Sequence, residues 1–119
     1  MRSTVSSRAD GRMKMQDRIL SMLGIAQKAG KVVSGGFQCE KAIQGRQASL
    51  VILACDAQKN TSEMIRNKCA YYGIPLIQYS NKDALGRAIG KEERACAAVT
   101  DEGLGLNIKK LYDSGKKEE

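Results

Sequence analysis

The sequence predicts an α/β fold, a single-domain three-layer α/β/α sandwich with a mixed four-stranded sheet. Helical and strand patterns alternate along the chain from residue 15 to residue 113. Strands that are separated by short amphipathic helices are typical of one sheet covered on both faces. The chain has 119 residues, the length of one domain and too short for two good cores.

The first half of the domain is predicted to contain a helix at about 15–29, a strand at 31–34, a second helix that follows the glycines and runs to about residue 44, and a strand at 49–54. Apolar residues at helical spacing define the first helix, and Gly30 follows it in the position of a C-terminal cap. Gly24 inside that helix predicts a close packing neighbour, because an interior glycine costs about 1 kcal/mol. Two glycines separate the first strand from the second helix, which Gly45 ends. The apolar, β-branched run at 49–54 predicts a strand buried on both faces.

The second half is predicted to contain helices from residue 60 to 72, from 80 to 90 and from 100 onward, with strands at 75–79 and 94–99. Asn60 and Glu63 resemble a capping box, and Ser80 is a candidate cap for the next helix. Asp101 and Glu102 suit the positive end of the last helix. The short first strand and the alanine-rich last strand are candidates for the edges of the sheet.

The two ends of the chain are expected to lie outside the fold. Residues 1–14 are predicted to form a disordered basic tail, and residues 114–119 a charged end. Met13, within the tail, and Met15, just beyond it, are candidate natural starts. The domain itself then spans residues 15–113. No apolar run approaches the roughly 20 residues of a membrane span, and no secretory segment occurs, so we expect a cytoplasmic protein.

Composition favours a nucleic-acid partner over catalysis. The chain carries 20 Lys and Arg against 13 Asp and Glu, a net charge of +7, which suggests an anionic partner. It contains no His, which removes the commonest general base and most catalytic zinc sites. We therefore expect no enzyme activity, no cofactor and no metal. The cysteines are expected to be reduced and mostly buried thiols; they are Cys39, Cys55, Cys69 and Cys96.

The glycines that open the second helix form the first candidate binding motif. The exposed N–H groups of a helix start favour an anion, and Gly35 and Gly36 lack the Cβ atoms that would keep a phosphate away. Gln38 and Lys41 are three residues apart, so they share a face of this helix and could reach the acceptors of a guanine edge. The alternative interpretation is a plain tight turn beside two solvated polar residues.

Further basic residues supply a second candidate surface. Lys28 and Lys31, with Lys41 and Arg46, could form a basic stripe beside the glycines. In the charged loop before the last strand, Lys91 and Arg94 could grip phosphate; the alternative is a solvated loop. Asp56 follows a buried strand, but no nucleophile has a partner base in view.

From about residue 23 to residue 111 the chain resembles the ribosomal protein L7Ae family, in its small bacterial form. The matching motifs are Leu23-Gly24-Ile25-Ala26, Ala29-Gly30-Lys31, Ser34-Gly35, Lys41-Ala42-Ile43, the run from Ala48 to Asp56, Ile74-Pro75, Leu85-Gly86-Arg87-Ala88-Ile89-Gly90 and Val99-Thr100-Asp101-Glu102-Gly103. The resemblance implies an α/β/α sandwich and binding of kink-turn RNA. It also implies a binding site at a Gly-x-Asn-Glu-x-x-Lys stretch and at the loop before the last strand.

Carried over residue by residue, Gly35 and Lys41 match that stretch. Phe37 stands in place of the family's Asn and Gln38 in place of its Glu. The Phe37 ring cannot hydrogen-bond a base edge but can stack on a base, and Gln38 keeps hydrogen-bonding capacity without the charge.

We therefore expect a non-catalytic, ribosome-associated protein that is monomeric when free and binds structured, kink-turn-like RNA, with ribosomal RNA as the first candidate. The expected RNA-binding residues are Lys31, Gly35, Gly36, Phe37, Gln38, Lys41, Lys91 and Arg94. The alternative is a protein-interaction or regulatory module on the same fold without RNA specificity, with Phe37 as its anchor.

Overall fold

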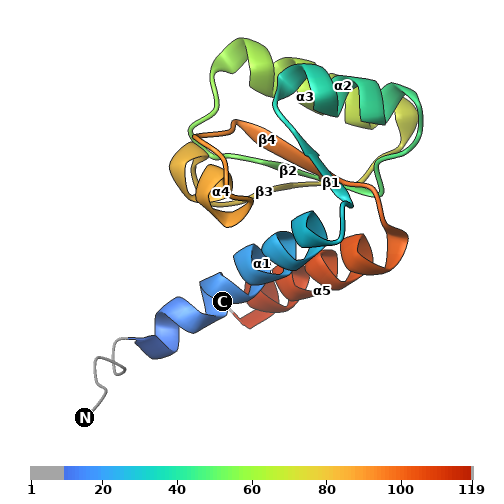
Figure 1. Cartoon of the computed structure of the whole chain (residues 1–119). Helices are drawn as coiled ribbons and strands as arrows, with labels where there is room; N and C mark the ends of the chain where they lie inside the picture. The colour runs from blue at the N-terminus through green and yellow to red at the C-terminus, as the bar shows by residue number, and fades with distance from the viewer. Residues whose placement is uncertain (1–9, 119) are drawn as a thin grey trace.

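A four-stranded mixed sheet forms the middle layer of the protein, with helices on both faces (Figure 1). The computed structural model describes residues 10–118. In chain order, the elements are α1 (Asp10–Lys28), β1 (Val32–Ser34), α2 (Gly36–Gln44), β2 (Leu50–Leu53), α3 (Lys59–Tyr72), β3 (Leu76–Gln78), α4 (Lys82–Ala88), β4 (Cys96–Val99) and α5 (Glu102–Glu118). The predicted three-layer α/β/α sandwich with a mixed sheet is confirmed.

The strands lie in the order β1-β4-β2-β3. Strand β2 pairs in parallel with β3, whereas β4 runs antiparallel to both β1 and β2. The first strand is therefore an edge, as predicted. The alanine-rich last strand is not an edge, and that prediction is wrong: β4 is buried along its whole length between β1 and β2. Its small side chains allow helices to close over both faces at the centre of the sheet.

Two hydrophobic cores lie on opposite faces of the sheet. Leu50 and Ile52 of β2 face the core under α1, α4 and α5, while Val51 and Leu53 face the core under α2 and α3. This alternation follows from the two-residue period of a strand. It confirms that the apolar run at 49–54 is covered on both faces.

Helix α4 lies in the same layer as α1 and packs closely against it. A Cβ atom on Gly24 would lie 3.0 Å from the carbonyl oxygen of Ala88, so the glycine admits the α4 backbone. This contact is the close neighbour that the interior glycine predicted.

Two helices begin differently from the prediction. Gln58 occupies the N-cap position of α3 without a side-chain cap, so Asn60 lies inside the helix and the predicted capping box is wrong. Asn81, and not Ser80, caps α4: its side-chain oxygen accepts a hydrogen bond from the Ala84 N–H at 2.8 Å. The Ser80 carbonyl instead accepts from the Cys55 N–H at 2.9 Å, and Ser80 has a φ of 64°.

The helices at the two ends extend beyond the expected domain boundaries. Helix α1 begins at Asp10, so residues 10–14 of the expected tail are helical, and residues 1–9 lie outside the described residues. Helix α5 continues to Glu118. Within the described part of the chain, no helix is both long enough and apolar enough to span a membrane.

Candidate nucleic-acid interface

The start of α2 exposes backbone donors. Gly35 is the N-cap residue, with φ 89° and ψ 155°, and no side chain among the described residues accepts a hydrogen bond at this end. The first bond of the helix runs from the Cys39 N–H to the Gly35 carbonyl at 2.9 Å, so the amides of residues 36–38 have no acceptor within the helix. The first turn contains no acidic residue. This helix end is therefore electrostatically open to an anion.

The glycines at this turn have different roles. Gly35 adopts a positive φ that an L side chain rarely adopts. Gly36 does not, and a Cβ atom there would make only ordinary contacts, at 3.8 Å to Met64 and 3.9 Å to Thr61. Gly35 is thus required by the backbone, whereas the fold itself does not require Gly36.

Beside this helix start, a hollow of about 300 Å³ lies along β1. Its described lining residues are Gln27, Val32, Val33, Ser34, Gln38, Lys91 and Arg94. Three of the predicted binding residues, from α2 and from the loop before β4, thus converge on one concave surface. The described lining contains two cations and no carboxylate.

The edge strand β1 adds backbone polar groups to this hollow. The Thr100 N–H donates to the Lys31 carbonyl at 2.8 Å, and the Gly35 N–H donates to the Cys96 carbonyl at 3.0 Å. These two bonds show which residues of this edge direct their backbone groups toward β4. In an antiparallel pair the residues between such positions direct their N–H and C=O groups away from the partner strand. The backbone groups of Val32 and Ser34 therefore point outward, along the lining of the hollow.

Arg94 ties the loop before β4 to this edge. Its Nε donates to Ser34 Oγ at 3.2 Å and its Nη1 donates to the carbonyl of Glu93 at 3.0 Å. The guanidinium thus holds the loop in shape as well as placing a charge at the hollow. Ser34 was not among the expected binding residues, although the Ser34-Gly35 pair is one of the motifs that carry the family resemblance.

The shape of the same loop depends on Gly86 in α4. A Cβ atom on Gly86 would lie 2.0 Å from the carbonyl oxygen of Glu92, so the loop backbone packs directly on this buried glycine. The Lys91 N–H also donates to the Gly86 carbonyl at 2.8 Å. The Leu85-Gly86-Arg87 motif contained this signal, since a glycine inside a helix predicts a close neighbour.

Lys41 lies one helical turn beyond Phe37. Its Nζ is 5.1 Å from the centre of the Phe37 ring, and the ring is 68% exposed. The nearby acid Glu40 pairs instead with Lys68 of α3, at 3.5 Å.

The basic stripe predicted from Lys28, Lys31, Lys41 and Arg46 does not form, and that prediction is wrong. Lys31 lies at the other end of β1 from Gly35, roughly 13 Å away at about 3.3 Å per strand residue. Arg46 follows the far end of α2, where its guanidinium carbon is 5.5 Å from the centre of the Tyr72 ring. Lys28 lines a different hollow. The sequence placed these charges near one another along the chain, but helix and strand lengths separate them in space.

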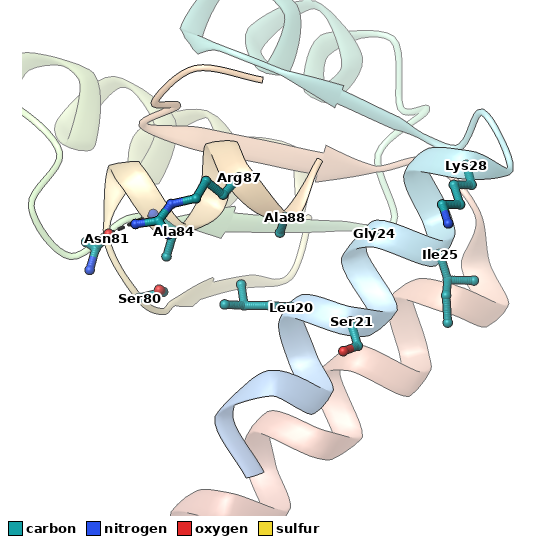
Figure 2. Close-up of a pocket in the computed structure, with 10 residues that line it drawn as sticks. All are labelled: Leu20, Ser21, Gly24, Ile25, Lys28, Ser80, Asn81, Ala84, Arg87 and Ala88. Carbon is teal, nitrogen blue, oxygen red and sulfur yellow. Dashed lines mark hydrogen bonds between the residues drawn. The ribbon is translucent and has the colours of Figure 1, made fainter. Parts of the chain in front are cut away.

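That second hollow, of about 770 Å³, lies between α1 and α4 (Figure 2). Leu20, Ile25 and Ala88 supply apolar side chains, and Lys28 and Arg87 supply charge. Arg87 is hydrogen-bonded to Asp83 one turn earlier in α4. None of the predicted RNA-binding residues lines this hollow.

The acidic side chains of Asp56 and Asp101 have structural roles, and most of the thiols lie in the core. Asp56 accepts a hydrogen bond from the Lys82 N–H at 2.9 Å, and Asp101 accepts from the Leu104 N–H at 2.9 Å, so both carboxylates cap helix starts. Three of the four thiols are buried, in line with the expectation of mostly buried thiols, and the fourth, Cys55, is exposed. Burial raises the pKa of Cys69 to about 11, which keeps this thiol protonated near neutral pH. Among the described residues, no group of His, Cys, Asp and Glu could hold a metal ion.

Comparison with known proteins identifies relatives of this chain. Over 92 residues it is 42% identical to the RNA-binding protein YlxQ of Bacillus subtilis (strain 168), covering 77% of this chain and 92% of that protein. It is 26% identical over 98 residues to the RNA-binding protein YlxQ of Enterococcus faecium, covering 82% and 94%.

Solved structures share the fold. A protein with unknown function from Bacillus halodurans C matches with a TM-score of 0.77 and 41% identity, over 80% of this chain and 96% of that one. The Giardia lamblia 15.5kD RNA binding protein matches with a TM-score of 0.70 and 22% identity, over 85% and 87%. The model of the ribosomal protein L7Ae/L30e/S12e/Gadd45 family matches residues 17–107. The chain therefore belongs to the L7Ae/L30e/S12e/Gadd45 family.

Proposed function

We propose that this chain is a non-catalytic RNA-binding protein that recognises a structured, kink-turn-like RNA. The observation that carries the proposal is the convergence of the uncapped start of α2 with Gln38, Lys91 and Arg94 on one hollow whose described lining has no carboxylate. Family membership and relatives named RNA-binding protein support the choice of RNA as the anion.

In the proposed complex, the protein contacts both the phosphate backbone and the bases of the RNA. The amides of Gly36 to Gln38 donate to a phosphate, and Lys91 and Arg94 neutralise neighbouring phosphates. Gln38 and Lys41 reach base edges, where amide and ammonium groups can donate to guanine acceptors. Lys31, at the other end of β1, contacts RNA only if the duplex extends along the strand.

Ribosomal RNA is the proposed target class, and the cytoplasm the proposed location. A kink-turn bends a duplex sharply and brings two phosphate backbones close together. A helix start beside a cationic hollow is suited to that shape, because it offers donors and charge over a short distance. The proposal takes the free protein to be a monomer.

Titration of a kink-turn RNA with wild-type protein and with Lys41→Ala tests this proposal. If Lys41 reads a base edge, the substitution weakens binding by about 1–3 kcal/mol, roughly 5- to 150-fold in Kd. Lys110→Ala is the matched control, because Lys110 is exposed on α5, in the other helical layer. An RNA in which the non-canonical pairs are replaced by Watson–Crick pairs controls for plain duplex affinity.

Equal affinity of wild type and Lys41→Ala would remove Lys41 from the interface. The exposed ring of Phe37 favours one alternative, in which this face binds a protein. Absence of any RNA shift at low salt, together with a protein that binds wild type but not Phe37→Ala, would establish that alternative.

A further inference from the structure

We propose that Phe37 is a positioning residue: its ring holds the Lys41 ammonium at the start of α2 without neutralising it, so that the cation is pre-placed for RNA. This inference rests on the proposed RNA-binding function and assigns a role to the residue by which the chain departs from the family motif.

The contact itself follows from helix geometry. Residues four apart are neighbours on a helix surface, and side chains lean toward the N-terminus of their helix. Lys41 therefore extends back along α2, and its Nζ comes to 5.1 Å from the centre of the Phe37 ring. This separation is within the range of a cation–π interaction.

Lys41 itself lies in the last turn of α2, but its ammonium reaches back to the ring of Phe37 in the first turn. The start of α2 carries the positive end of the helix dipole, and its first turn has no acidic residue. A cation drawn toward that end is repelled by it. The negative face of the aromatic ring offsets part of this repulsion and gives the ammonium a local energy minimum beside the exposed amides.

Three other cations among the described residues are held in a different way, by carboxylates, whereas Arg46 also lies over an aromatic ring, that of Tyr72. Lys68 pairs with Glu40, Arg87 with Asp83, and Lys109 with Asp113. In each of these pairs a carboxylate cancels the charge. No ion pair joins Lys41 to a carboxylate among the described residues, so the neutral ring orders this side chain and leaves its full charge available to an anion.

Pre-placement should increase affinity because a flexible lysine otherwise loses its rotamer freedom when it binds. Phe37 itself cannot donate a hydrogen bond to a base, and it does not need to: the ring acts through Lys41. The inference differs from base stacking on Phe37, in which the ring would touch the RNA directly.

Fluorination of the ring tests the inference at this one position. The chain contains a single phenylalanine, so replacing phenylalanine throughout the protein with mono-, di- and trifluorinated analogues changes only residue 37. Each fluorine withdraws electron density from the ring face and weakens the cation–π interaction with little change in size. We expect kink-turn RNA affinity to fall stepwise, by about two- to fivefold in total. In a Lys41→Ala background the same series should leave affinity unchanged.

Two substitutions complete the experiment. Phe37→Trp should retain wild-type affinity, because indole is the strongest cation–π partner, whereas Phe37→Leu should resemble the trifluorinated protein. Tyr71→Leu is the matched control: Tyr71 is 81% exposed on α3, and its loss should not change RNA affinity. Thermal unfolding of each protein separates lost binding from lost folding.

The outcomes distinguish this inference from the proposed function. Affinity that stays constant or rises with fluorination, or that changes equally in the Lys41→Ala background, would overturn the positioning role while leaving RNA binding intact; the second result would indicate stacking. Failure of the unmodified protein to bind the RNA would overturn both.

Discussion

At the scale of single residues, the candidate interface depends on a division of roles between Gly35 and Gly36. Gly35 is required because the chain turns into α2 with φ 89°. Gly36 lies in the first turn of α2 with room for a side chain, and a glycine in a helix is less stable than alanine by about 0.5–1 kcal/mol. The fold alone therefore does not explain a glycine at residue 36, whereas the close approach of a ligand to the amides would explain it.

Gly36→Ala separates folding from binding. We expect the free energy of unfolding to be unchanged or to rise by up to about 1 kcal/mol, and RNA affinity to fall because the added Cβ keeps a phosphate away from the amides. Urea unfolding and RNA titration measure the two quantities. Gly35→Ala, the control, should lose stability because of its positive φ. Unchanged RNA affinity of Gly36→Ala would exclude a close phosphate contact at this turn.

At the scale of elements, the loop between α4 and β4 is shaped from both sides. Gly86 admits the loop backbone, and the Arg94 guanidinium bonds the loop to Ser34 of β1. Lys91 reaches the hollow only because this loop is held against α4. The position of Lys91 and Arg94, the loop residues of the candidate interface, therefore depends on α4 and β1 together.

Gly86→Ala should displace this loop. The added Cβ would lie 2.0 Å from the Glu92 carbonyl oxygen and 2.6 Å from its carbon, and backbone atoms cannot move aside as a flexible side chain can. We expect a loss of about 1–3 kcal/mol in the free energy of unfolding, typical of overpacking, together with weaker RNA binding. Gly103→Ala is a control of the same chemistry, because its Cβ would meet only Asp101 Oδ2, at 3.4 Å. Wild-type stability of Gly86→Ala would show that the loop adapts without cost.

At the scale of the whole molecule, the net charge of +7 is distributed unevenly. Several cations are paired with carboxylates, and others lie far from the hollow, such as Arg46 beside Tyr72. Binding should therefore depend on the few cations at the interface and not on the total charge.

The salt dependence of RNA binding measures how many phosphates the cations at the interface neutralise. If about four phosphates are neutralised, the logarithm of the association constant should fall against the logarithm of salt concentration with a slope of roughly −3 to −4. Removing Lys91 should make the slope shallower by about one unit. Titrations between about 50 and 200 mM salt test this. A slope near zero would contradict phosphate-dominated binding, and a slope that Lys91→Ala leaves unchanged would remove Lys91 from the contacts.

The sequence by itself determined the order of the elements, the two-faced burial of β2 and the glycine-opened start of α2, because these features depend on local spacing and on residue type. The tertiary structure decided the rest. It placed β4 inside the sheet, moved the α4 cap from Ser80 to Asn81, and separated Lys31 and Arg46 from Lys41. Strand order, and the distance between charges carried by different elements, depend on how those elements pack, and no local pattern in the chain records that packing.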